Sequence, residues 1–230
     1  MCNWWSGTGT RLGGVENGRR SYADPCGVAR ALDAVGERWA LLVVRELSLG
    51  PRRFGQLRRG LPDVSPNVLS QRLRELEAAG VVRRFEPDPL ATGAAYALTE
   101  RGTALDPVLQ ALGRWGAAEP PVATREMSPV SFVRMLRVLV RPDARDGDWA
   151  LVLGGEPFAL RVRGGAAEVT RGRPEHPTAV LTGDVGPVRR LLEGEALGDL
   201  EGEGVLVVEG DRRAARRLPS LFRVPPGGLH

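Results

Sequence analysis

Apolar residues recur at helical spacing through the first part of the chain. Three segments show this period, each ending at a glycine or a glycine–proline pair: residues 28–35, 39–47 and 53–59. Spacings of three and four positions place apolar side chains on one face of a helix. The pattern therefore predicts three helices before residue 60.

A fourth predicted helix, at residues 66–79, has the clearest boundary signals. Ser65 is a favoured N-cap, Pro66 suits the first helical position, and Gly80 accepts the left-handed conformation that often follows a helix. One face of this helix is apolar: Leu69, Leu73 and Leu76. The opposite face, at about 100° per residue, is polar: Asn67, Gln71 and Arg74, with Ser70 on its flank.

Beyond Gly80 the period changes from helical to extended. Residues 81–85 and 95–98 are predicted strands, and the turn-rich segment between them predicts a hairpin loop. Thr99 then caps a further helix, expected to run to about residue 118. Three helices followed by a two-stranded hairpin make the winged helix-turn-helix topology, which holds a recognition helix in the major groove of DNA. We expect residues 66–79 to be that helix.

The second half of the chain mixes both periods. Helices are predicted at 131–140, 185–193 and 212–221, and strands at 149–153, 157–163, 167–171, 179–182 and 205–209. We therefore expect an α+β protein with two domains. The predicted divisions are a flexible N-terminal arm at 1–22, a winged helix-turn-helix DNA-binding and dimerisation domain at 23–118, a linker at 119–128, a small α/β domain at 129–223 and a tail at 224–230.

The distribution of charge supports the prediction of DNA binding. All 32 basic residues are arginine, which a GC-rich genome explains, so the abundance of arginine alone says little about nucleic acid. Position is more informative, because residues 51–84 hold eight arginines against three acids, an excess larger than the +4 of the whole chain. A clustered positive surface suits contacts with phosphates, which release counterions.

Candidate DNA-binding residues fall into two groups. Candidates for base contacts lie on the outer face of the predicted recognition helix: Asn67, Ser70, Gln71 and Arg74. Arg72, on the same helix, is a further DNA-binding candidate. Amide and guanidinium groups there suit bidentate contacts with adenine and guanine. Candidates for backbone contacts lie at the start of that helix, before the third helix and beside the wing: Ser65, Pro66, Arg52, Arg53, Arg83 and Arg84.

Other classes of function find less support. Cys2 and Cys26 do not make a disulfide framework, and His176 and His230 stand apart without neighbouring metal ligands. The sequence has no Ser-His-Asp set, P-loop or dinucleotide-binding glycine motif, so we expect no enzyme, cofactor or metal. It also lacks an apolar run long enough to cross a bilayer and a secretory signal, so we expect a cytoplasmic protein with no membrane partner.

A series of motifs runs through the first domain in order. They are GERWALL at 36–42, REL at 45–47, GPRRFGQL at 50–57, LPDVSPNVLSQRL at 61–73, LEAAGVV at 76–82, YALT at 96–99 and WG at 115–116. On these motifs, residues 26–116 resemble the HxlR family of winged helix regulators, a branch related to MarR-type repressors. The resemblance implies a homodimer whose terminal helices form the interface and whose two recognition helices bind a pseudo-palindromic operator.

By the same resemblance, residues 99–118 and the helix after Cys26 build the dimer interface. The apolar stripe that ends at Trp115 is consistent with this, but it also suits the core of a single subunit. Cys26 aligns with a cysteine that some HxlR-type proteins use to sense oxidants, quinones or other electrophiles. A sensing thiol needs a lowered pKa, for which Arg20 and Arg30 are the local candidates; the alternative is a small, semi-buried residue at a helix start.

The second domain carries shorter motifs. They are AVLTGD at 179–184, LLEG at 191–194, and the strand and final helix after residue 205. These resemble the sterol-carrier-protein-like fold, a small sheet whose helices cover an apolar cavity. The resemblance implies a pocket for a small apolar effector that changes the spacing of the two recognition helices. Candidate lining residues are equally suited to an ordinary core: Phe132, Met135, Trp149, Phe158 and Phe222.

These observations predict a dimeric transcriptional regulator that binds double-stranded DNA and is expected to act as a repressor. Three alternatives stay open: a regulator that senses electrophiles through Cys26, a lipid-binding or lipid-transfer protein, and a second domain that only buries a face of the dimer.

Overall fold

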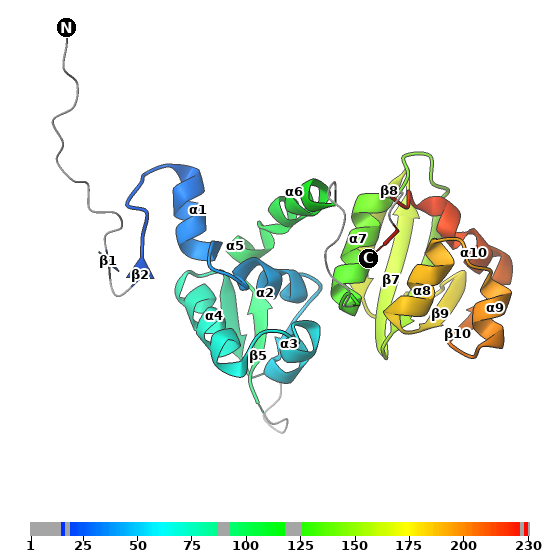
Figure 1. The fold of residues 1–230 in the computed structure, drawn as a ribbon, viewed down its shortest axis with the longest axis horizontal. Coiled ribbons are helices and arrows are strands. Elements are labelled where there is room, and N and C mark those ends of the chain that lie inside the picture. The colour runs from blue at the N-terminus through cyan, green and yellow to red at the C-terminus, as the bar shows by residue number, and fades with distance from the viewer. Residues whose placement is uncertain (1–14, 17–18, 87–92, 118–125, 226–227, 230) are drawn as a thin grey trace, which may run out of the picture.

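A computed structural model describes residues 15–16, 19–86, 93–117, 126–225 and 228–229 of the chain. Figure 1 shows two units joined in sequence order, the first mostly helical and the second built on a larger sheet. In the described part of the chain, no helix is both long and apolar enough to span a membrane. Of the N-terminal arm predicted at 1–22, residues 1–14 and 17–18 lie outside the described part of the chain.

Six helices and a three-stranded sheet make up the described part of the first unit. The helices are α1 (Gly27–Val35), α2 (Ala40–Leu47), α3 (Phe54–Gly60), α4 (Pro66–Ala78), α5 (Glu100–Thr103) and α6 (Asp106–Gly116). The antiparallel sheet has the order β3 (Arg52–Arg53), β5 (Ala95–Leu98), β4 (Val82–Phe85). The predicted helices before Gly80 and the two strands of the wing are confirmed.

Two short pieces of sheet were not predicted from the sequence. Strand β3 is only two residues long and pairs with Tyr96 and Ala95 of the wing, so its local pattern carries almost no signal. Strands β1 (Val15–Glu16) and β2 (Arg19–Arg20) form an equally short antiparallel pair inside the predicted N-terminal arm.

The helix expected from Thr99 to about residue 118 is divided into two, which corrects the prediction. Thr99 does cap α5, since its hydroxyl accepts a hydrogen bond from the N–H of Gly102 at 3.1 Å. Pro107, however, has no N–H to donate to the carbonyl of Thr103, so the first helix ends there. Proline is tolerated in the first turn of α6, where N–H groups have no intrahelical acceptor.

The second unit is a five-stranded sheet with helices packed on it. Its helices are α7 (Pro129–Leu139), α8 (Val185–Leu192), α9 (Leu197–Gly202), α10 (Arg212–Arg217) and the short 3₁₀ helix η1 (Leu218–Leu221). Its strands are β6 (Gly147–Leu153), β7 (Glu156–Arg163), β8 (Ala166–Arg171), β9 (Ala179–Gly183) and β10 (Leu206–Gly210). The order is β10-β9-β6-β7-β8, with β6 and β9 parallel and the other pairs antiparallel.

The sequence predicted most of this unit, with two differences. Helix α9 was missed because it is six residues long and contains two glycines. The final helix is not continuous, because Pro219 interrupts it and η1 replaces its last turn.

The core of the second unit corrects part of the predicted ligand pocket. Phe132 and Phe158 are completely buried among the aliphatic residues between α7 and the sheet, so they are ordinary core residues. Met135 is half-buried and packs against the same core. Leu229, in the predicted tail, also belongs to this core, and its N–H donates to Glu193.

Polar side chains join the two units. The hydroxyl of Ser128, which caps α7, donates to the buried carboxylate of Glu46 on α2 at 2.7 Å. Arg134 of α7 donates to Asp106 of α6 at 2.6 Å. Arg52 of β3 forms an ion pair with Glu156 of β7 at 2.5 Å. Each contact connects residues more than 25 positions apart, so the second unit is docked onto the first through α7 and β7. Figure 1 shows α7 on the side of the second unit that faces the first.

Candidate nucleic-acid interface

Helix α4 is anchored on one side and exposed on the other. Its N-cap Ser65 accepts a hydrogen bond from the N–H of Val68 at 3.3 Å, and Pro66 occupies the first turn as expected. The apolar face is fully buried: Leu69, Leu73 and Leu76. The opposite face is exposed: Asn67, Gln71, Arg74 and Ala78, with Ser70 half-buried on the flank. A rigid helix therefore presents two amides and a guanidinium to solvent, the groups that suit base edges.

These polar side chains are already linked to one another along the helix. The guanidinium of Arg74 donates to the amide oxygen of Gln71 at 2.7 Å, and the amide nitrogen of Gln71 donates to Glu75 at 2.7 Å. Because the pairs are three and four residues apart, they lie side by side on the helix surface. The links restrict rotamers without burying the donors.

Arg72 differs from the other candidates on this helix. It is 14% exposed and forms ion pairs with Glu75 at 2.5 Å and with Glu37, before α2, at 3.4 Å. A guanidinium neutralised in this way is less available to a base than Arg74. Its described contacts tie α4 to the segment that precedes α2.

The wing begins beside α4 and carries two exposed arginines. Arg83 and Arg84 are neighbours in β4, so their side chains leave opposite faces of the strand. Arg83 lies over the ring of Phe85, with its guanidinium carbon 4.6 Å from the ring centre. The tip of the wing, at 87–92, lies outside the described residues.

Arg84 faces a basic groove between α3 and the wing. The groove has a volume of about 560 Å³ and is lined by Arg53, Phe54, Gly55, Gln56, Arg59, Arg84, Gly93, Ala94 and Tyr96. Arg53 donates to the carbonyl of Gly93 at 2.9 Å, which ties α3 to the wing. Three guanidiniums around one hollow suit a phosphate of the duplex backbone. Arg59 is one of the eight arginines of residues 51–84, but the sequence did not single it out as a site residue. Its position beside Arg58 at the end of a predicted helix is the signal that could have identified it.

The expectation that Arg52 contacts phosphate is not supported by its position. Its side chain is 2% exposed, and both terminal nitrogens lie within hydrogen-bonding distance of Glu156, at 3.3 and 2.5 Å. Burial and the neighbouring Arg171 lower the pKa of Arg52, while Glu156 opposes that effect. Arg52 and Arg53 are adjacent in an extended strand, so only one of them can face the groove. Arg52 is part of the junction between the two units.

Cys26 lies at the start of a helix, as predicted, but it is not the semi-buried residue of the alternative interpretation. It is exposed and stands at the N-cap of α1. The backbone N–H groups of Ala29 and Val28, in the first turn of α1, lower the pKa of its thiol. The sequence suggested Arg20 and Arg30 as the cause of such a shift, but the amides at the start of α1 supply it.

Two helices of the first unit expose apolar side chains. On α1 these are Val28 and Leu32, and on α6 they are Val108, Leu112 and Trp115. Trp115 is 77% exposed, and none of the residues of α6 is fully buried. Leu105 and Leu109 on the inner side of the same stripe pack against the core of the first unit. Among the described residues, only its outer side, which ends at Trp115, is not used by that core.

In a comparison with known protein families, residues 34–122 match the family described as HxlR-like helix-turn-helix. The HTH-type transcriptional regulator YvaP of Bacillus subtilis is 40% identical over 86 residues, which cover 37% of this chain and 80% of YvaP. The HTH-type transcriptional regulator Rv3095 of Mycobacterium tuberculosis is 46% identical over 91 residues, covering 39% of this chain and 56% of Rv3095.

Among solved structures, the crystal structure of the HTH-type transcriptional regulator YtcD of Bacillus subtilis is similar to the same part of the chain. It is 33% identical, with a TM-score of 0.39, and the alignment covers 40% of this chain and 95% of YtcD.

Proposed function

The chain belongs to the HxlR-like helix-turn-helix family of transcriptional regulators, and on that premise we propose that it binds a pseudo-palindromic operator in a sequence-specific manner, as a homodimer. We expect it to act as a repressor. The observation that carries the proposal is the exposed face of α4, where Asn67, Gln71 and Arg74 stand over a fully buried leucine face. The basic groove beside the wing supports it, since Arg53, Arg59 and Arg84 suit the phosphates that flank a contacted base.

Selection of binding sites from genomic fragments by the purified protein tests the proposal. We expect a short site with two related half-sites about one duplex turn apart, as two symmetric recognition helices require. On that site, Arg74→Ala is expected to weaken binding about 5- to 100-fold and to relax the preference at one base pair in each half-site.

The matched control is Arg216→Ala on α10, which removes the same charge from an exposed position in the second unit. Arg59→Ala supplies a second comparison, because loss of a phosphate contact weakens binding to all sequences and makes its salt dependence shallower. Recovery of no preferred sequence, or equal binding by the Arg74 and Arg216 variants, contradicts the proposal.

The proposed regulation is by a small ligand in the second unit. The support for it is the attachment of that unit to the first through Ser128, Arg134 and Glu156, so that a change in one unit can reach the other. The likeness of residues 129–223 to the sterol-carrier-protein-like fold stays a prediction. Operator release by a bound ligand is the measurement that tests this regulation.

A second mode of regulation, through oxidation or alkylation of Cys26, is favoured by one observation. The thiol is exposed, and the amides of α1 lower its pKa, which raises the fraction of reactive thiolate. Diamide or a quinone is then expected to release the operator from the wild type and not from Cys26→Ser. Equal release from both proteins would remove this mode.

A further inference from the structure

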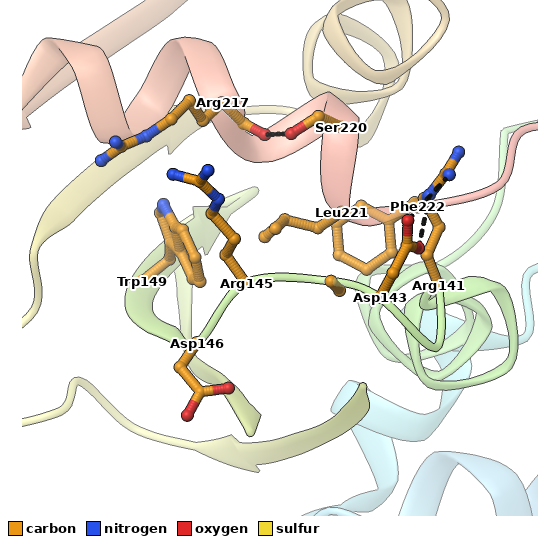
Figure 2. A pocket seen from close by; sticks show the side chains of 10 residues that line it. Arg141, Asp143, Arg145, Asp146, Trp149, Arg217, Ser220, Leu221 and Phe222 are labelled. Carbon is orange, nitrogen blue, oxygen red and sulfur yellow. Dashed lines mark hydrogen bonds and ion pairs between the residues drawn. The ribbon is translucent and has the colours of Figure 1, made fainter. Parts of the chain in front are cut away.

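A cavity lies at the far end of α7, on the second unit. Its volume is about 570 Å³, and it is lined by Arg141, Asp143, Ala144, Arg145, Asp146, Trp149, Arg217, Ser220, Leu221 and Phe222. These residues come from the loop between α7 and β6, the start of β6, and the chain end from α10 to η1 (Figure 2). A volume in this range is typical of pockets for small molecules and too small for a duplex.

Among the described residues, two arginines at this cavity have no ion-pair partner. In the described part of the chain, the side chains of Arg145 and Arg217 form no ion pair, whereas Arg141 is paired with Asp143 at 3.0 Å. The remaining acid, Asp146, accepts a hydrogen bond from the N–H of Gly164, and Figure 2 shows its carboxylate pointing away from both arginines. The cavity therefore presents two unpaired guanidiniums.

The other side chains that line the cavity include an apolar and rigid group. Trp149 is 4% exposed, and its indole N–H donates to the carbonyl of Ala214 at 3.3 Å. Gly147 lies against the same ring so closely that any side chain at this position would collide with it. Leu221 and Phe222 complete this wall, and Figure 2 shows the Arg145 side chain between Trp149 and Leu221.

The walls of the cavity are also tied to one another. The N–H of Arg141 donates to the carbonyl of Leu221 at 2.8 Å, and the N–H of Arg223 donates to the carbonyl of Leu139 at 2.8 Å. On the other side, Gly165 has φ +73° and packs directly on the carbonyl of Pro142, where a Cβ would collide. The loop that carries Arg145 is therefore held in place without a ligand, which reduces the entropy cost of binding.

We propose that this cavity binds a small molecule that carries one anionic group on an aromatic or aliphatic body. Arg145 and Arg217 receive the carboxylate, sulfonate or phosphate, and Trp149, Leu221 and Phe222 contact the apolar part. The inference supplies a ligand class for the regulation proposed above and rests on that proposal for its consequence at the operator. It also revises the apolar effector expected from the sequence, since only Trp149 and Phe222 of the five candidates line the cavity.

The test is a fluorescence titration of the full chain with two matched probes. 1-Anilinonaphthalene-8-sulfonate carries a sulfonate, and N-phenyl-1-naphthylamine has the same aromatic rings without it. Each probe is titrated into the wild type, into Arg145→Gln/Arg217→Gln, and into Arg213→Gln/Arg216→Gln, which removes two exposed charges from α10 outside the cavity. Operator binding without a probe is measured on the same preparations.

The expected result is saturable binding of the sulfonate probe that becomes at least tenfold weaker in the cavity variant only. The uncharged probe is expected to bind the three proteins within a factor of two of one another. The inference is overturned if the wild type does not bind the sulfonate probe, if both double variants bind it equally, or if an excess of non-specific duplex displaces it. Operator binding is measured separately, so a failure of the ligand inference can be distinguished from a failure of the proposed function.

Discussion

At the scale of single residues, burial decides what each arginine of this protein does. Arg52 and Arg53 are identical in type and adjacent in sequence, yet one is 2% exposed in the junction and the other lines the groove beside the wing. The alternation of side chains in β3 separates them, since consecutive residues of a strand point to opposite faces. The same contrast separates Arg72, which is paired with two acids, from the exposed Arg74.

Replacement of Arg52 by alanine is expected to affect stability more than DNA binding. It leaves Glu156, which is 24% exposed, with only Arg171 as a described partner, so we expect a loss of about 1–3 kcal/mol in the free energy of unfolding. Urea unfolding of the wild type, Arg52→Ala and Arg59→Ala measures this.

Arg59 is exposed in the groove, so its variant is expected to keep wild-type stability and lose operator affinity. The assignment of Arg52 to the junction fails if Arg52→Ala unfolds like the wild type and shows the shallower salt dependence of a lost phosphate contact.

At the scale of elements, α1 and α6 each expose apolar side chains that the described core does not use. Their exposed side chains are large: Val28, Leu32, Val108, Leu112 and Trp115. Helices of a globular protein normally bury such a face, and contiguous apolar patches mark sites of association. This is the surface that we expect to form the dimer.

Substitution of Trp115 by glutamate is expected to produce a monomer at micromolar concentration. A charge buried without a partner at the centre of an apolar interface is costly, and loss of the second recognition helix is expected to weaken operator binding at least tenfold. Sedimentation equilibrium and the operator assay measure the two effects.

Val207→Glu is the matched control, because Val207 is 53% exposed on β10 of the second unit. If the Trp115 variant sediments like the wild type, the assignment of α6 to the interface is wrong.

At the scale of the whole molecule, α7 connects the two proposed sites. Its N-cap Ser128 contacts Glu46, and Arg134 and Arg137 contact Asp106 of α6. Its last turn leads into Arg141 and the loop that forms the cavity. A single helix therefore runs from the winged helix-turn-helix unit to the pocket, and we propose it as the route by which a ligand biases the position of the first unit.

Acid is expected to weaken this connection at Asp106. Partial burial raises the pKa of Asp106, but hydrogen bonds from Arg137 and Arg134 outweigh it, so the pKa falls from 3.8 to about 2. A carboxylate with a lowered pKa in the folded state stabilises the protein fully above its unfolded pKa, and the stabilisation is lost as the pH falls from about 4 to about 2. After allowance for solvent screening, the contribution at neutral pH is about 1–2 kcal/mol.

Urea unfolding of the wild type and Asp106→Asn at several pH values tests this. We expect the variant to be less stable by about 1–2 kcal/mol at pH 6 and the two proteins to converge only as the pH falls to about 2. Asp143→Asn, at an exposed ion pair, is expected to show little difference from the wild type throughout. A difference at Asp106 that does not change with pH would contradict the role given to its charge.

The sequence by itself determined the four helices before Gly80, the two strands of the wing and the polar face of α4. The N-cap Ser65, Pro66 and Gly80 act within a turn of their own position, and the spacing of Leu69, Leu73 and Leu76 needs no distant partner to be recognised. Local signals of this kind also identified Thr99 as a cap, although Pro107 was overlooked as a break.

Only the tertiary structure decided which charges are free and where a ligand can bind. Arg52 meets Glu156 from 104 positions away, and the cavity joins Arg145 and Trp149 to Arg217 and Leu221. No local sequence pattern predicts these long-range contacts, because the burial and pairing of a side chain depend on which distant elements pack over it. The chain's short-range preferences fix helices and strands, whereas the free energy of a charge is fixed by its neighbours in space.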